Sequence, residues 1–355
     1  MSNGSGTMKA VVFDGPYKVS VQDRPIPKVA HERDIVIKVQ ATALCGSDLH
    51  IYRGLEPTDP GPIMGHEFVG HVIEAGAGVQ TVAVGDKIVC PFTVSCGQCW
   101  YCRQGDTARC VESACFGSPN LNGGQAEYVR IPHADGTVMK APSSVPENAL
   151  ILMADILPTG FYGVKSALAM AQGADVSQST MVIIGAGPVG CCAALSALHF
   201  KPKHLFVVDS VDSRLDIARK LGAEPLNFQK DPAGMKARVM EVTEGRGADM
   251  VVEVVGLSPA LRTAFDLVRP FGVISSIGVH NAEIPWSATE GYDKNLRFQM
   301  GRCPVRKVFA EALDILERYH EKLNFMFDKI MPLSDAVEAY DLFDKRQVQK
   351  VVFTV

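Results

Sequence analysis

The segment 181–190, with the sequence MVIIGAGPVG, places an apolar run directly before a glycine-rich turn. The apolar run favours a buried strand, and the small residues CCAALSAL that follow favour a helix packed against it. Gly185, Gly187 and Gly190 have the spacing G-x-G-x-x-G, which lets a turn approach a pyrophosphate while the helix N-terminus supplies amide donors. The spacing alone is a weak signal, and its place between a strand and a helix strengthens the prediction.

Strand-like and helical patterns alternate from this turn to about residue 290, which predicts a parallel, doubly wound α/β sheet. Asp209 ends the next strand pattern, 19 residues beyond Gly190, near the spacing of about 20 expected for a carboxylate that binds an adenosine ribose. Such a carboxylate repels a 2′-phosphate, so we expect NAD in preference to NADP. Two alternatives stay open: Arg214 could tolerate the phosphate, and Asp209 could be an ordinary strand-end turn residue.

A second group of polar side chains lies far upstream, in LCGSDLH at 44–50 and GHEFVG at 65–70. Cys45, His66 and Glu67 offer a thiolate, an imidazole and a carboxylate, a set that suits zinc. Each residue alone has a simpler interpretation, since a buried cysteine is often an apolar filler and most histidines only form hydrogen bonds. The prolines and glycines at 54–65 predict a loop without regular structure.

Four cysteines have the pattern C-x2-C-x2-C-x7-C: Cys96, Cys99, Cys102 and Cys110. Four thiolates at this spacing can close a tetrahedron around zinc, and because no position stays open for substrate, such a site is structural. An iron–sulfur cluster and a set of reduced thiols are the alternatives. The chain has ten cysteines in 355 residues, too few for a disulfide scaffold, which indicates a reducing compartment.

The composition is that of an ordinary globular protein, and the length favours two domains. A net charge of −4 gives no electrostatic signature for nucleic acid or for an anionic membrane surface, so we expect a small-molecule partner. Residues 181–198 carry no charge, but their glycine-proline centre argues against a membrane span. We see no secretory signal, expect residues 1–7 to form a flexible tail, and expect a cytoplasmic protein.

Cys45, the pattern GHExxGxxxxxG at 65–76, the four-cysteine segment and GAGPVG at 185–190 occur in the order found in the zinc-dependent medium-chain alcohol dehydrogenases, which this chain resembles. The segments CGSDLHIYRG, GGQAEYVRIP and ADILPTGFYG look most like the branch of glutathione-independent formaldehyde dehydrogenases. The resemblance implies a β-rich, GroES-like catalytic domain made of residues 1–157 and 291–355, with a zinc lobe at about 90–115. It also implies a Rossmann domain inserted at residues 158–290.

Carried over by position, the resemblance implies Cys45, His66 and Asp155 as ligands of a catalytic zinc, with Glu67 either a ligand or standing just behind the ion. Asp155 occupies a position where the best-known members have cysteine, and a helix N-cap remains the alternative for it. Asp48 fits an acceptor for the ring N–H of His66.

The resemblance also implies a proton path, in which Ser47 bonds the substrate oxygen and His50 forms the outer end. Lys350 is expected near the cofactor pyrophosphate. The implied cofactor contacts come from the glycine turn, the Asp209 region and one residue beside the nicotinamide: Thr159, Gly185, Gly187, Pro188, Val189, Gly190, Asp209 and Arg214.

Together these features predict an enzyme that transfers a hydride between an alcohol and NAD, with two zinc ions per chain and a dimeric or tetrameric assembly. A first alternative is a formaldehyde dehydrogenase or aldehyde dismutase with tightly bound NAD. A second is a non-catalytic binding protein that retains a dehydrogenase fold.

Overall fold

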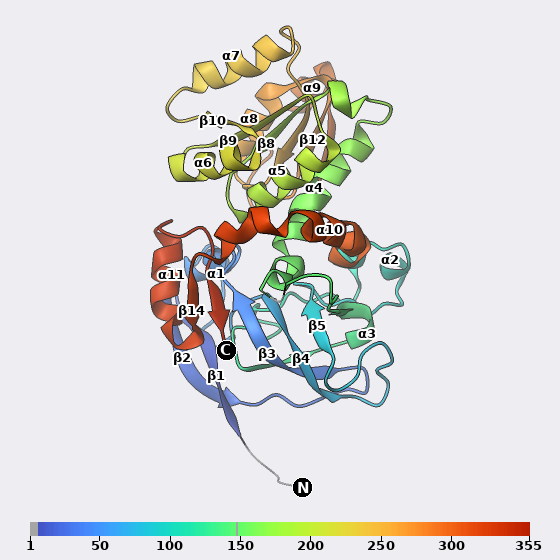
Figure 1. The fold of residues 1–355 in the computed structure, drawn as a ribbon, viewed down its shortest axis with the longest axis vertical. Coiled ribbons are helices and arrows are strands. Elements are labelled where there is room, and N and C mark those ends of the chain that lie inside the picture. Colours follow the sequence, from blue (N-terminus) through green and yellow to red (C-terminus); the bar gives the residue numbers. More distant parts are fainter. Residues whose placement is uncertain (1–5, 147) are drawn as a thin grey trace. The chain divides into compact units, whose positions relative to one another are not determined.

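The computed structural model describes residues 6–146 and 148–355, and the chain divides into two units. Unit 1 comprises residues 1–155 and 304–355, and unit 2 comprises residues 156–303 (Figure 1). The sequence-based boundary after residue 290 therefore falls inside unit 2, because the strand Arg297–Met300 pairs with the sheet of that unit. Of the tail expected at 1–7, residues 1–5 lie outside the described residues, whereas Thr7 already belongs to the first strand.

Unit 2 is built on one parallel sheet of six strands, whose spatial order 3-2-1-4-5-6, counted along the chain, is that of a dinucleotide-binding fold. Neighbouring strands of this sheet pair in parallel, as the alternating pattern predicted. Across the sheet the strands are β10 (Glu224–Asn227), β9 (His204–Asp209), β8 (Thr180–Ile184), β11 (Ala248–Glu253), β12 (Val268–Ser276) and β13 (Arg297–Met300).

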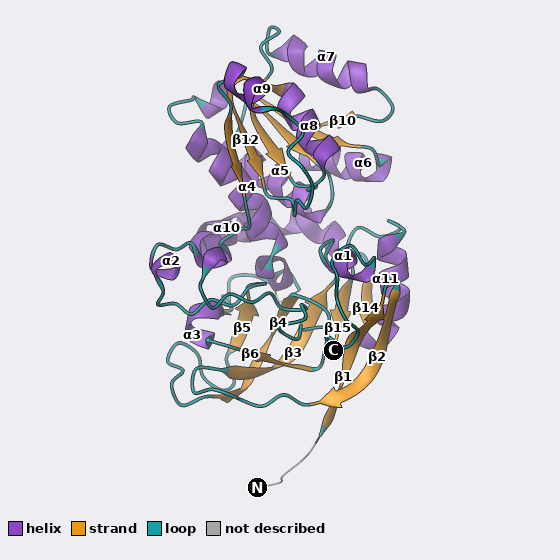
Figure 2. Ribbon diagram, turned by 180° about the vertical axis from the view of Figure 1, so that it is seen from behind, coloured by secondary structure: helices purple, strands orange, loops and turns teal. Residues whose placement is uncertain are grey.

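Helices cover both faces of this sheet, because successive residues of each strand point to opposite sides (Figure 2). Met181 and Ile183 pack with α4 (Ile156–Met170), α5 (Pro188–Phe200) and α6 (Asp212–Leu221). Val182 and Ile184 pack on the other side with α7 (Pro232–Val242) and α8 (Ser258–Leu267). The remaining helices of the unit are η3 (Val176–Gln178) and α9 (Ala288–Asp293). Helix α8 ends at Leu267, because β12 begins at Val268.

Unit 1 is organised around a mostly antiparallel sheet that contains segments from both ends of the chain. Its final strand pairs with β3, residue Phe353 lying opposite Thr42. The main path across the sheet is β14 (Ile330–Pro332), β15 (Val352–Thr354), β3 (Ile35–Ala43), β4 (Glu67–Ala75), β5 (Lys87–Cys90) and β7 (Met139–Lys140). In addition, β6 (Tyr128–Ile131) pairs with β3, and β1 (Thr7–Gly15) forms a hairpin with β2 (Lys18–Pro25).

The described helices of unit 1 are short except for α10, which buries Val308, Ala312 and Ile315 along one side. Residues 54–65 contain neither helix nor strand, which confirms the predicted loop. The helices are α1 (Asp48–Tyr52), α2 (Trp100–Arg103), α3 (Ala134–Thr137), α10 (Val305–Tyr319) and α11 (Ala336–Asp344), with 3₁₀ helices η1 (Thr107–Arg109), η2 (Leu150–Ala154), η4 (His320–Phe327) and η5 (Leu333–Asp335).

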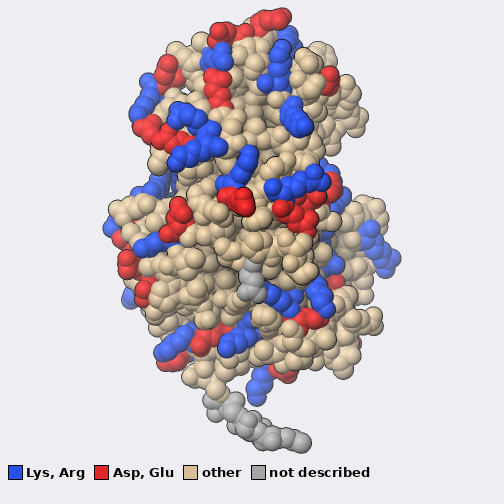
Figure 3. Space-filling model, viewed as in Figure 1, with Lys and Arg blue, Asp and Glu red and all other residues tan. Residues whose placement is uncertain are grey.

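The charge-free stretch at 181–198 is divided between β8 and α5 by the glycine turn. Among the described residues, no helix combines the length and apolar character needed to cross a bilayer. Acidic and basic side chains are interspersed on the face of the molecule drawn in Figure 3.

Candidate functional site

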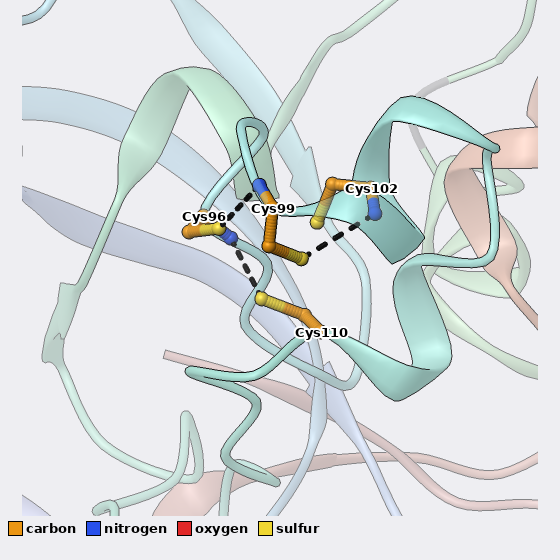
Figure 4. A group of neighbouring side chains, drawn as sticks. All are labelled: Cys96, Cys99, Cys102 and Cys110. Atoms are coloured by element: carbon orange, nitrogen blue, oxygen red, sulfur yellow. Dashed lines mark hydrogen bonds between the residues drawn. The ribbon is translucent and has the colours of Figure 1, made fainter.

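The four cysteines of the C-x2-C-x2-C-x7-C segment converge on one point (Figure 4). Their Sγ atoms all lie within 4.8 Å of one another. Backbone amides support the cluster: Cys96 N donates to Cys110 Sγ at 3.2 Å, and Cys99 N donates to Cys96 Sγ at 3.3 Å. Amide donors of this kind stabilise thiolates, so the loop is suited to hold negatively charged sulfur.

The cysteines of this cluster differ in their proton affinity. The backbone N–H groups of Cys102 and Val111 lower the pKa of Cys99 to about 6. Burial, together with the neighbouring Cys99 sulfur, raises the pKa of Cys102 to about 12. Four thiolates cannot share such a small volume without a cation, so the arrangement fits a divalent metal that has no open coordination position.

The second cluster joins residues that are far apart in the sequence. Cys45 lies between β3 and α1, His66 directly precedes β4, and Glu67 is the first residue of that strand. Asp155 lies between η2 and α4, where the backbone leaves helical geometry at φ −150° and ψ −70°. Because η2 packs against β4 and β5, the Asp155 side chain lies close to the side chains of Cys45, His66 and Glu67.

One potential ligand atom from each of Cys45, His66, Glu67 and Asp155 lies within 4.8 Å of the others, and all four residues are buried. Asp155 Oδ2 is 3.3 Å from His66 Nε2 and 3.7 Å from Cys45 Sγ. Donors bound to one zinc ion at about 2.0–2.3 Å lie no more than about 4.6 Å apart, so only small movements separate this arrangement from a coordination shell.

Asp48 orients two members of this cluster. Its Oδ1 is 3.0 Å from His66 Nδ1, which leaves Nε2 facing Asp155, and its Oδ2 accepts a hydrogen bond from Cys45 N at 2.9 Å. This is the arrangement by which a carboxylate fixes the tautomer of a metal-binding histidine.

Burial and neighbouring charges shift the pKa values of two members of this cluster. Burial raises the pKa of Cys45, and the Glu67 carboxylate raises it further. Burial lowers the pKa of His66, but Asp48, Cys45 and Asp155 outweigh this effect, and the net result lies well above the usual value. A divalent cation would reverse both tendencies, because it favours the thiolate and the neutral imidazole.

Glu67 is held by Lys350, a contact that sequence reasoning missed. Lys350 Nζ lies 2.6 Å from Glu67 Oε2 and 3.1 Å from Leu44 O, and neither side chain of the pair is exposed. The sequence predicted Lys350 near a pyrophosphate, whereas in this arrangement its ammonium group is buried against Glu67 and Leu44 O.

The other carboxylate oxygen of the pair, Glu67 Oε1, is buried and has no hydrogen-bond partner. Burial raises the pKa of Glu67 despite Lys350, whereas the Glu67 carboxylate keeps the pKa of Lys350 above its usual value despite burial. With Glu67 offset by Lys350, the charges of Cys45 and Asp155 would balance those of one divalent cation. The donor set and its charge thus fit zinc.

Ser47 and His50 lie on the segment that follows Cys45. Ser47 immediately precedes α1, and its carbonyl accepts a hydrogen bond from His50 N at 3.1 Å. His50 belongs to α1, and its side chain is 25% exposed. Both residues are thus half-buried, on the segment that carries Cys45.

In unit 2, the glycine turn has the conformation that its spacing predicted. Gly185 follows β8 with φ +102°, and Gly187 precedes the first residue of α5. A Cβ atom on Gly190 would lie 1.9 Å from Gly185 O, so only glycine fits there. Pro188 and Val189 form the first turn of α5, so the amide-rich helix N-terminus and the turn lie together.

Asp209, at the end of β9, reaches this turn. Its Oδ2 accepts a hydrogen bond from Ala186 N at 2.8 Å, and its Oδ1 accepts from Ser210 N and Val211 N at 2.7 and 2.9 Å. An ionised carboxylate has about four acceptor positions, so capacity remains for a ligand hydroxyl. Arg214 lies half-buried in α6, and Thr159 lies half-buried in α4.

Two segments of the chain match models of known protein families. Residues 31–143 match the family described as alcohol dehydrogenase GroES-like domain, and residues 188–318 match the family described as zinc-binding dehydrogenase.

Two curated relatives cover nearly the whole chain. Zinc-type alcohol dehydrogenase B from Aspergillus flavus is 60% identical over 346 residues, which cover 98% of this chain and 81% of that protein. Glutathione-independent formaldehyde dehydrogenase from Pseudomonas aeruginosa is 30% identical, with 97% and 96% covered. The similarity to the formaldehyde dehydrogenase branch is thus only distant.

A solved structure has the same fold throughout. Alcohol dehydrogenase TADH from Thermus sp. ATN1 aligns with a TM-score of 0.91 at 33% identity, over 98% of this chain and 100% of that one. The predicted fold class, a Rossmann sheet inserted in a β-rich GroES-like domain, is confirmed.

Proposed function

The chain belongs to the zinc-dependent medium-chain alcohol dehydrogenases, and from this premise we propose which of its residues perform each task. Enzymes of this family use zinc and a nicotinamide cofactor on small-molecule alcohols. We assign Cys45, His66 and Asp155 as the ligands of a catalytic zinc. The observation that carries this assignment is their burial within ligand distance of one another, while Lys350 holds one oxygen of Glu67.

Zinc bound there supplies Lewis acidity, which lowers the pKa of a substrate hydroxyl and polarises the carbonyl in the reverse direction. Asp48 holds the His66 ring in the orientation that zinc binding needs. Glu67 stays paired with Lys350 and is not one of the three ligands. Ser47 accepts the proton that the substrate hydroxyl gives up and releases its own hydroxyl proton, and His50 takes up a proton and passes it to solvent. General-base assistance of this kind contributes a rate factor of about 10²–10⁴.

We assign the cysteines Cys96, Cys99, Cys102 and Cys110 to a second, structural zinc, which gives two ions per chain. Gly185, Gly187, Pro188, Val189 and Gly190 bind the cofactor pyrophosphate.

Asp209 accepts hydrogen bonds from the adenosine ribose, with Arg214 beside it, and Thr159 contacts the nicotinamide. The negative charge of Asp209 favours NAD over NADP, because a 2′-phosphate would meet a carboxylate. We further propose a cytoplasmic enzyme that assembles as a dimer or tetramer.

The test is NADH formation by the purified protein with NAD and a panel of ethanol, isopropanol, benzyl alcohol and cyclohexanol. We expect turnover with at least one alcohol, loss of turnover after chelation, and recovery on adding zinc. NADP in place of NAD should give slower turnover. A protein that binds zinc and NAD but oxidises no alcohol and reduces no corresponding aldehyde or ketone would contradict the proposal.

A further inference from the structure

The segment after α1 folds back onto His50. Leu55 N and Glu56 N both donate to the carbonyl of His50, at 2.8 and 3.3 Å, and Gly54 makes the turn with φ +72°. The backbone therefore fixes Glu56 beside the histidine, although Glu56 lies six positions further along the sequence. Glu56 itself is half-exposed, with 45% of its side chain accessible.

The Nδ1 atom of the His50 ring has a carboxylate neighbour but no hydrogen bond. Its Nδ1 atom is buried and has no hydrogen-bond partner, and the nearest carboxylate oxygen paired with it, Glu56 Oε1, is 3.6 Å away. This separation is slightly longer than a hydrogen bond, and a small rotation of the half-exposed Glu56 side chain closes it. Hydrogen bonds of catalytic groups are often long before the reacting complex forms.

The other charged groups close to this helix are engaged elsewhere. Arg53 Nε pairs with Asp344 Oδ1 at 2.6 Å, and the Asp48 carboxylate contacts His66 and the Cys45 amide. Glu56 therefore supplies the carboxylate that faces the His50 ring.

We propose that Glu56 is a positioning residue for His50, an inference that rests on the proton path of the proposed function. The carboxylate holds the ring proton on Nδ1, which leaves the lone pair of Nε2 free to accept the proton released by the substrate. It then stabilises the imidazolium, and the ring returns to neutrality when Nε2 gives that proton to water. Glu56 carries no proton in this scheme and acts only as an acceptor, which is the role of the aspartate in a Ser-His-Asp triad.

The experiment compares five variants with wild type. Each is studied as zinc-loaded enzyme with NAD and the alcohol of the panel that wild type oxidises fastest. Glu56→Gln removes the charge at nearly constant shape, and Glu56→Asp keeps the charge on a shorter side chain. Asp59→Asn removes a charge from an exposed position of the same loop and is the matched control. His50→Gln removes the proton acceptor, and a His50→Gln/Glu56→Gln double variant completes the cycle. Melting temperature and zinc content establish that each variant is folded.

Stopped-flow absorbance then gives the rate of NADH formation, and steady-state kinetics give KM. We expect Glu56→Gln to slow NADH formation about tenfold, a part of the factor of about 10²–10⁴ available to a general base, with KM for the alcohol unchanged. Glu56→Asp should recover part of the rate, and Asp59→Asn should behave as wild type. In the His50→Gln background, Glu56→Gln should have no further effect.

Two failures are distinguishable. If His50→Gln slows the reaction but Glu56→Gln matches Asp59→Asn, or acts equally without His50, the role of Glu56 is overturned and the proposed function stands. If His50→Gln forms NADH as fast as wild type, the proton path itself is wrong, and the inference about Glu56 falls with it.

Discussion

Lys350 Nζ lies 2.6 Å from Glu67 Oε2 in a pair whose two side chains are completely buried, although the residues are 283 positions apart. The pair joins the end of the chain to the first residue of β4, next to His66. A buried ion pair is weak evidence for net stabilisation, but the loss of one partner is costly because the other charge stays buried.

Replacing Lys350 with methionine should therefore lower the free energy of unfolding of the metal-free protein by about 3–5 kcal/mol, the range found when one partner of a buried pair is removed. Urea denaturation followed by circular dichroism measures this. The Glu67→Gln/Lys350→Met double variant is the matched control and should recover much of the loss, because no charge is left buried. Equal stability of Lys350→Met and wild type would show that the pair does not persist in solution.

Zinc binding to the Cys45 cluster should strengthen as pH rises. The pKa values of Cys45 and His66 are both raised, so both groups hold protons at neutral pH in the metal-free protein, whereas zinc binds the thiolate and the neutral imidazole. Binding must then release protons from these two residues. Calorimetric titration in buffers of different ionisation enthalpy measures the number released, and Cys45→Ser should release fewer. A binding enthalpy that is the same in every buffer would contradict this assignment.

The cofactor preference should depend on Asp209. Asp209→Asn keeps an acceptor oxygen near Ala186 N but removes the charge. The value of kcat/KM with NAD should therefore fall, by an amount that corresponds to an increase of about 1.5–3 kcal/mol in the activation free energy, the usual contribution of a hydrogen bond to a charged group. The preference for NAD over NADP should narrow, because the repulsion of a 2′-phosphate is lost. Asp212→Asn, at an exposed position of α6, is the control. An unchanged ratio would remove Asp209 from the ribose site.

The four-cysteine cluster should hold zinc for stability. Cys102→Ser should retain one zinc per chain instead of two and should unfold at a lower temperature, since metal binding contributes free energy of folding. Cys90→Ser, at a cysteine outside both clusters, should keep both ions. Metal analysis alongside thermal denaturation checks this, and two zinc ions in Cys102→Ser would show that the cluster is not a metal site.

The parts of this protein that were predictable from sequence are those coded by short-range spacing. The Gly185–Gly190 turn, the carboxylate of Asp209 and the four-cysteine segment each depend on residues within about two dozen positions, and the backbone geometry of one strand, turn or loop brings them together. The alternating apolar pattern likewise predicted the parallel sheet.

Contacts between residues far apart in the sequence could not be predicted from a spacing pattern. Asp155 was placed only by family resemblance, and the pairing of Lys350 with Glu67 has no counterpart in any spacing pattern. The boundary predicted at residue 290 was early, because the strand Arg297–Met300 is recognised as part of unit 2 only through its pairing with β12. Glu56 was missed because its place beside His50 depends on a turn in an otherwise irregular loop.

The most direct test of the account is metal analysis of wild type and Asp155→Ala, combined with NADH formation in the alcohol panel. The central claim is that Asp155 completes, with Cys45 and His66, the shell of a catalytic zinc. We predict two zinc ions per chain in wild type, a fall toward one in Asp155→Ala, and loss of alcohol oxidation while the four-cysteine site keeps its metal. Two retained zinc ions and unchanged turnover in Asp155→Ala would contradict the claim.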